Sequence, residues 1–153
     1  MNELDDVLRL LVAAGTGLLI GIDRDMNNKP VGMRTLALVA LGSALVSISV
    51  IEFQNLRDHP DAISRVIQGV VAGVLTGVGF IGAGVILRRG NTVRGLSTAA
   101  TFWAVAAVGT AAGLAEFGLA LGLTMVVLLA HVLLRPVSAW IERRAPPSEA
   151  GPK

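Results

Sequence analysis

The feature that most constrains the fold is a stretch of 39 residues, 96–134, whose only charged side chain is Glu116 if His131 is neutral. A helix that crosses a bilayer needs about 20 apolar residues, so this stretch is long enough for two crossings. It must therefore fold back on itself. The small residues on either side of Glu116 predict a turn there, with a fourth span at 96–115 and a fifth at 117–134.

Three more apolar runs precede this stretch, at 4–22, 35–51 and 66–87. Only 16% of the residues are charged, whereas about 25% is typical of a soluble domain. A soluble core could not hide five such runs, so we expect an all-α, polytopic membrane bundle of about five transmembrane helices within residues 1–135. Residues 136–153, which contain several prolines, are expected to form a short, partly disordered cytoplasmic tail.

The lysines and arginines predict the orientation of the bundle, because basic loops stay in the cytoplasm. The N-terminus and the second and fourth loops carry three basic residues, whereas the first and third loops and the tail carry ten. We therefore expect the N-terminus outside and the C-terminus in the cytoplasm. The outer set is Arg9, Arg57 and Arg65, and the inner set is Arg24, Lys29, Arg34, Arg88, Arg89, Arg94, Arg135, Arg143, Arg144 and Lys153.

Small residues recur at helical spacing on several spans. Lipid gives helices no hydrophobic drive to associate, so close van der Waals fit must hold them together. Two interpretations are open: compact packing within one subunit, or a dimer interface or sliding surface. The glycines expected to mediate packing are Gly17 and Gly21 on the first span and Gly73, Gly77 and Gly79 on the third.

The first basic loop places Asp23 and Arg24 just after the first span and Arg34 just before the second. One interpretation is interfacial anchoring with exposed ion pairs, each worth about 0–1 kcal/mol. The other is a buried cytoplasmic network that binds an ion or a partner. An acid as close to the bundle as Asp23 is a candidate for function.

The second basic loop contains Asn91, which favours a turn, and Arg94, which comes just before the fourth span. The free N–H groups at a helix N-terminus, together with the Thr98 hydroxyl, favour an anion. Three anions fit this place: the carboxylate of Asp23, a lipid phosphate and a carboxylate of a partner. We favour Asp23, so that an Arg94–Asp23 ion pair joins the two loops.

Several classes of function have no basis in the sequence. The chain has no cysteine, which excludes disulfides and thiolate metal sites. It carries none of the common catalytic or phosphate-binding motifs, so we expect neither an enzyme nor a cofactor. The basic residues are too scattered, and the aromatic residues too few, for nucleic-acid binding. His131 is expected to be an interfacial histidine rather than a metal ligand, because no second ligand accompanies it.

Two ordered signatures resemble the MgtC/SapB family of membrane proteins. The first is GLLIGIDRD at 17–25, followed by KPVGMRT at 29–35. The second is GVGFIGAG at 77–84, followed by NTVRGLSTAAT at 91–101. The resemblance extends over about residues 8–134. It departs from the family pattern at Asp23 and Asp25, where Glu is commoner, and at Leu36, where His often stands.

The resemblance implies a bacterial inner-membrane protein linked to growth at low magnesium. Some members support survival inside macrophages, and the best-studied branch acts on the proton-driven ATP synthase. Those roles are not expected here, because the soluble C-terminal domain of longer members has no counterpart. The residues that inherit the signature polar roles are Asp23, Arg24, Arg34, Asn91, Arg94 and Thr98.

We therefore expect a non-enzymatic protein of magnesium or envelope homeostasis that acts through a membrane partner. The alternative is a small oligomeric carrier or channel for a cation or other solute. A magnesium path would normally use one or two carboxylates, and the predicted spans place none at mid-depth, which weighs against the alternative. The expected partners are the lipid bilayer, further copies of the chain and a membrane protein, without a metal ion.

Overall fold

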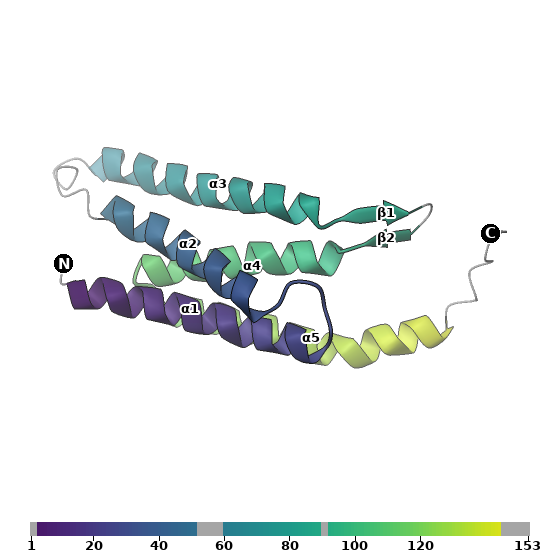
Figure 1. The fold of residues 1–153 in the computed structure, drawn as a ribbon. Coiled ribbons are helices and arrows are strands. Elements are labelled where there is room, and N and C mark those ends of the chain that lie inside the picture. The colour runs from purple at the N-terminus through teal and green to yellow at the C-terminus, as the bar shows by residue number, and fades with distance from the viewer. Residues whose placement is uncertain (1–2, 52–59, 90–91, 145–153) are drawn as a thin grey trace.

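The computed structural model describes residues 3–51, 60–89 and 92–144, which form a bundle of five helices and one β-hairpin (Figure 1). The expected all-α bundle is confirmed. Four helices, α2 to α5, are long and apolar enough to cross a membrane, while a crossing by α1 and the orientation of the termini stay predictions. The elements are α1 (Glu3–Met26), α2 (Met33–Ile51), α3 (Pro60–Gly84), β1 (Leu87–Arg89), β2 (Thr92–Arg94), α4 (Leu96–Gly113) and α5 (Phe117–Arg144).

The turn between α4 and α5 lies where the sequence predicts it. The N–H of Leu114 donates to the Thr110 carbonyl and that of Glu116 to the Ala111 carbonyl, which satisfies the end of α4. Ala115 turns the chain with a positive φ of 64°. A left-handed residue just past a helix end is a common way to reverse the chain, so α5 can begin at once and return along the bundle.

The other helix ends depart from the expected spans. α3 begins at Pro60 and ends at Gly84, because residues 87–89 pair with residues 92–94 as an antiparallel hairpin. Gly95 has φ 91°, and a Cβ there would lie 2.0 Å from the Val85 carbonyl oxygen, so this position requires glycine. α5 continues through Pro136 to Arg144, and residues 145–153 of the predicted tail lie outside the described part.

α4 occupies the centre of the bundle and packs against each of the other four helices. In the apolar stretch of α4 that is long enough to cross a membrane, 61% of the residues are buried, compared with 11% in the corresponding stretch of each of α3 and α5. The residues that it buries are mostly small, which allows neighbouring helices to come close. The core that α4 forms with α1 and α2 includes Ala13, Leu36, Ala40, Ala44, Val105, Ala106, Val108 and Ala112.

Two of the predicted packing glycines bring α1 into backbone contact with α2. A Cβ on Gly17 would lie 2.8 Å from the Ala37 Cα, and a Cβ on Gly21 would lie 2.2 Å from the Met33 Cα. No larger side chain fits either place without a backbone shift. The glycines therefore bring the end of α1 and the start of α2 together, and this approach positions the loop between them.

The predicted glycines of α3 behave differently. A Cβ on Gly73, Gly77 or Gly79 would meet no atom of another element within 4 Å, and all three residues are exposed. Packing within the subunit, one of the two interpretations of these glycines, is therefore not formed at Gly73 and Gly77, which share one face of α3, nor at Gly79 on another face. The helix instead presents a shallow strip of bare backbone to its surroundings.

Candidate functional site

The candidate site is built around Arg24, in the last turn of α1, whose side chain is only 1% exposed. Its Nε donates to the Val31 carbonyl oxygen at 3.1 Å, and its Nη2 donates to the Pro30 carbonyl oxygen at 2.7 Å. Both acceptors lie in the loop between α1 and α2. The guanidinium thus binds the loop between α1 and α2, which the close approach of Gly21 to Met33 holds near α1.

The same guanidinium reaches α4. Nη2 donates to Thr98 Oγ1 at 2.8 Å, and Nη1 donates to Thr101 Oγ1 at 3.1 Å. The two threonines are three residues apart, which puts them on one face of the first turns of α4. The planar fork of Arg24 can bond both hydroxyls and both carbonyls at once, as the ammonium of a lysine could not. One side chain therefore joins α1, the loop and α4.

The loop between α1 and α2 is strained, and its backbone forms hydrogen bonds with charged side chains of α1. Val31 has φ 68°, a conformation that costs a β-branched residue about 1–3 kcal/mol. The Arg24 bond holds its carbonyl in place, and Asp25 Oδ2 accepts the N–H of Met33 at 3.0 Å, at the start of α2. A Cβ on Gly32 would lie 1.8 Å from Asp25 Oδ1. The fold maintains this conformation with the charged residues that follow the first predicted span.

His131 places α5 beside the network. Its Nε2 lies 3.4 Å from Thr101 Oγ1 and its Nδ1 lies 2.8 Å from the Val127 carbonyl oxygen. A carbonyl only accepts, so Nδ1 is assigned the hydrogen in that contact. Thr101 in turn donates its hydrogen to the Ser97 carbonyl at 2.8 Å. With both hydrogens used in this way, no hydrogen is assigned between Nε2 and Thr101 Oγ1, so α5 adjoins the Arg24 network through a polar contact of 3.4 Å rather than an assigned hydrogen bond.

A cavity of about 390 Å³ lies against this network, between α1, its loop, α4 and α5. Its lining combines charged and polar residues from the loop end with apolar residues from α4 and α5. The lining residues are Asp23, Arg24, Asn27, Lys29, Ser97, Ala100, Thr101, Ala104, Val127, Ala130, His131 and Leu134.

The electrostatics of Arg24 combine two opposing effects. Burial lowers the pKa of its guanidinium, and the nearby carboxylates of Asp23 and Asp25 oppose that change. Because the ordinary pKa of arginine lies far above neutral pH, the side chain remains a cation in proteins. The site therefore holds a permanent positive charge beyond the end of the predicted first span, next to the cavity.

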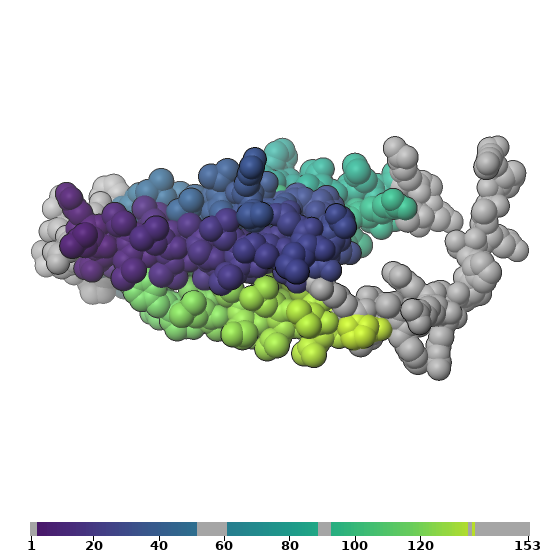
Figure 2. Space-filling model, turned by 60° about the horizontal axis from the view of Figure 1, so that its bottom comes forward, coloured from purple at the N-terminus to yellow at the C-terminus, as the bar shows by residue number. Residues whose placement is uncertain are grey.

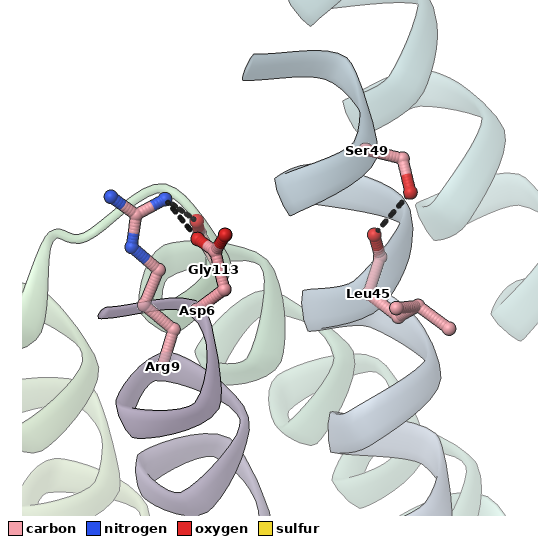
Figure 3. Close-up of polar contacts among 5 residues, drawn as sticks. All are labelled: Asp6, Arg9, Leu45, Ser49 and Gly113. Carbon is pink, nitrogen blue, oxygen red and sulfur yellow. Dashed lines mark hydrogen bonds and ion pairs between the residues drawn. The ribbon is translucent and has the colours of Figure 1, made fainter. Parts of the chain in front are cut away.

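A second arginine of α1 lies near the opposite end of α4. Arg9 is 9% exposed, and its Nη1 donates to the Gly113 carbonyl oxygen at 3.4 Å and lies 3.6 Å from Asp6 Oδ1 (Figure 3). In the same view, Ser49 donates to the Leu45 carbonyl within α2. Both Arg9 contacts are long, so among the described residues at this end of the bundle no network comparable to that of Arg24 is formed.

Comparison with known proteins identifies the family. A profile of the MgtC family matches residues 10–140. The chain belongs to the MgtC family. This confirms the resemblance that the two signatures indicate, and the family match together with the apolar helices makes the chain a membrane protein.

The MgtC-family relatives include proteins from distant bacteria. Protein MgtC of Salmonella paratyphi A is 42% identical over 147 residues, which cover 90% of this chain and 60% of the relative. An uncharacterized protein of Synechocystis is 42% identical over 141 residues, covering 92% and 56%. Protein SrpB of Synechococcus elongatus is 44% identical over 115 residues, covering 69% and 61%. The chain thus spans about 60% of the length of these relatives, and no solved structure matches it.

The structure brings together only some of the MgtC-signature residues. Arg24 and Thr98 are bonded to each other, and Asp23 lines the adjoining cavity. Arg34 and Arg94 are exposed on α2 and β2, and Asn91 lies outside the described residues.

The expected Arg94–Asp23 ion pair is not found in the part of the chain that the structure describes. Arg94 lies at the end of β2, paired with Leu87 across the hairpin, and its side chain is exposed. The guanidinium that reaches the first turns of α4 is instead that of Arg24, from the last turn of α1.

Thr101 belongs to the network and His131 adjoins it, and sequence reasoning assigned neither residue to it. A signal for Thr101 was available, since Thr98 and Thr101 are three residues apart and fall on one helix face. His131 gave no such signal, because its position beside Thr101 depends on how α5 packs against α4. Its surroundings in the structure are a hydroxyl and a backbone carbonyl.

Proposed function

We propose that this MgtC-family chain is a non-enzymatic protein of the bacterial inner membrane that acts by binding a second membrane protein. Its role in magnesium or envelope homeostasis is carried over from the family resemblance. The observation that supports partner binding best is the bare face of α3, where glycines at spacing four are exposed and have no contact across the bundle.

The face of α3 has the geometry of an interhelical contact whose other half is not supplied by the residues that the structure describes. Gly69, Gly73 and Gly77 follow one another at four-residue spacing, and a Cβ on any of them would meet open space. In α1 and α4 the comparable glycines lie against backbone of α2. Small-residue strips of this kind let two helices approach closely in lipid, where close fit drives association. A helix of another protein would complete the contact.

The polar site joins the helices of the bundle to one another. Arg24 donates four hydrogen bonds, all to carbonyl or hydroxyl oxygens of the same chain. Among the residues that the structure describes, no group of three or more His, Asp and Glu side chains could hold a metal ion. The Arg24 network holds α1, the loop after it and α4 together. In this proposal α3, at the edge of the bundle, binds the partner.

Photo-crosslinking in native membranes tests this proposal. A photoactivatable residue at Gly73 is expected to give a protein adduct whose mass identifies the partner. The matched control is Gly122 on α5, which is also exposed and has nothing within 4 Å, and we expect it to crosslink to lipid only. Lipid adducts alone at both positions would overturn the proposal, and an adduct of twice the chain mass would identify a second copy as the partner.

A second candidate function is transport, favoured by the cavity of about 390 Å³ beside the Arg24 network. Flux into proteoliposomes of the purified chain distinguishes the two. Solute movement that Asp23→Ala abolishes would replace partner binding by a carrier, because Asp23 lines the cavity. We expect no flux of Mg²⁺ above that of empty vesicles.

A further inference from the structure

The cavity beside Arg24 is divided into a polar end and apolar walls. The polar end is formed where the loop after α1 meets the first turn of α4, and includes Arg24, Lys29 and Ser97. The walls are formed by alanine and larger aliphatic residues of α4 and α5. Figure 2 shows the face on which α1 and α5, which bound the cavity, lie side by side.

The apolar walls extend along α4 and α5 far enough to contact part of a lipid acyl chain. On α4 the lining extends from Ser97 to Ala104, and on α5 from Val127 to Leu134. Each stretch contains eight residues, and its first and last positions are seven steps apart, or about 10 Å at 1.5 Å per residue. Leu134 is also the last residue of the apolar window of α5. The polar end of the cavity therefore lies at the depth of the lipid headgroups, and the walls lead from there into the apolar layer.

The charges at the polar end favour a negative group. Among the lining residues, Arg24 and Lys29 contribute two positive charges and Asp23 contributes one negative charge. The carboxylate of Asp25 also acts on Arg24, but it lies outside the lining and accepts the N–H of Met33. Lys29 is exposed, so its ammonium is available to a ligand at the surface. Arg24 makes four hydrogen bonds from its five N–H groups, and within the described part of the chain the fifth, on Nη1 beside Thr101, has no partner.

We propose that this cavity binds an acidic phospholipid from the surrounding bilayer, with the phosphate beside Arg24 and Lys29 and one acyl chain along the apolar walls. Basic pockets between transmembrane helices are a known way to hold acidic headgroups on the cytoplasmic side. The lipid fills a space that small side chains such as Ala100, Ala104 and Ala130 leave open. Its phosphate supplies the acceptor that the last N–H of Arg24 lacks.

Native mass spectrometry of the purified, delipidated chain tests this directly. The probes are phosphatidylglycerol and phosphatidylcholine with the same acyl chains, titrated separately. We expect the chain to retain phosphatidylglycerol at least fivefold better. Lys29→Gln should lower that preference about fivefold, the effect of removing one basic residue near an acidic headgroup. Arg34→Gln is the matched control, because Arg34 is an exposed cation near the same loop that does not line the cavity.

A second pair of variants tests the apolar walls independently of charge. Ala130→Leu should fill part of the cavity and reduce retention of both lipids, while Ala72→Leu, at an exposed position on α3 outside the cavity, should not. Equal retention of the two lipids, unchanged by Lys29→Gln and Ala130→Leu, would overturn the proposal. Retention of inorganic phosphate with no lipid would overturn it too, by assigning the cavity to a soluble anion.

Discussion

Arg24 and Arg9 both extend from α1 to α4, one near each end of α4, yet the two contacts differ in burial and in the number and length of their hydrogen bonds. Arg24 is 1% exposed and makes four hydrogen bonds of 2.7–3.1 Å. Arg9 is 9% exposed and makes one hydrogen bond of 3.4 Å and one ion pair of 3.6 Å. The Arg24 end is a closed network, whereas the Arg9 end is a loose contact.

The difference teaches where the bundle is held and where it can adjust. At the Arg9 end, Asp6 Oδ1 is buried and lacks a hydrogen-bond partner in the described part of the chain, so the ion pair compensates only in part for burial. At the Arg24 end, each acceptor is a loop carbonyl or an α4 hydroxyl at normal bonding distance. We infer that the relative position of α1 and α4 is set at the Arg24 end.

The largest effect expected is that of Arg24→Met, which removes the four hydrogen bonds but keeps an apolar side chain. It should lower the free energy of unfolding by about 3 kcal/mol, because two hydroxyls and two carbonyls lose a charged donor. The measurement is unfolding in detergent followed by tryptophan fluorescence. Arg34→Met is the control and should stay within about 0.5 kcal/mol. Equal effects of the two variants would contradict the buried network.

The threonines of α4 come next. Thr98→Val and Thr101→Val should each lower the free energy of unfolding by about 1.5 kcal/mol, since each leaves a buried N–H of Arg24 without an acceptor. Their effects should largely vanish in the Arg24→Met background. A double-mutant cycle measures this coupling, and effects that remain fully additive would show that the hydroxyls act independently of Arg24.

Arg9→Met should have a smaller effect, below about 1 kcal/mol, because its contacts are long and its charge pair is only partly buried. The same unfolding measurement applies. The salt dependence of the wild-type chain gives a second readout, since an ion pair near the surface weakens as ionic strength rises. A loss as large as that of Arg24→Met would remove the difference between the two ends.

The smallest effect is expected at Val31, in the loop that Arg24 holds. Val31→Gly should raise the free energy of unfolding by about 0.5 kcal/mol, because relief of the left-handed conformation slightly exceeds the added freedom of the unfolded chain. Val39→Gly, in a helical part of α2, is the control and should destabilise by about 1 kcal/mol or more. A destabilised Val31→Gly variant would show that this loop is not strained.

Part of this organisation could be predicted from the sequence. The start of the fourth and fifth spans at 96 and 117 follows from the length of one uncharged run, and both helices begin there. The two signatures selected Arg24 and Thr98, which are bonded in the structure. These features can be predicted because the length of an apolar run and the presence of a family motif are local properties of the sequence.

The remainder depends on contacts between distant segments. Arg24 and Arg94 both adjoin a span, and no local property tells which guanidinium will be buried. That outcome depends on the last turn of α1 meeting a helix that begins about 70 residues later. The glycines of α1 and α3 share the same four-residue spacing, yet only those of α1 lie against another helix, because the position of each helix in the bundle decides what its glycines meet.

The long separation between Arg24 and its threonines also affects how the protein is made. Thr98 and Thr101 follow Arg24 by 74 and 77 residues. At a synthesis rate of about 5–20 residues per second, Arg24 leaves the ribosome about 4–15 s before its partners. During that interval the two hydroxyls that accept from Arg24 in the folded chain have not yet been made. The contact between α1 and the central helix α4 can therefore form only late in synthesis, when α1, α2 and α3 are already present.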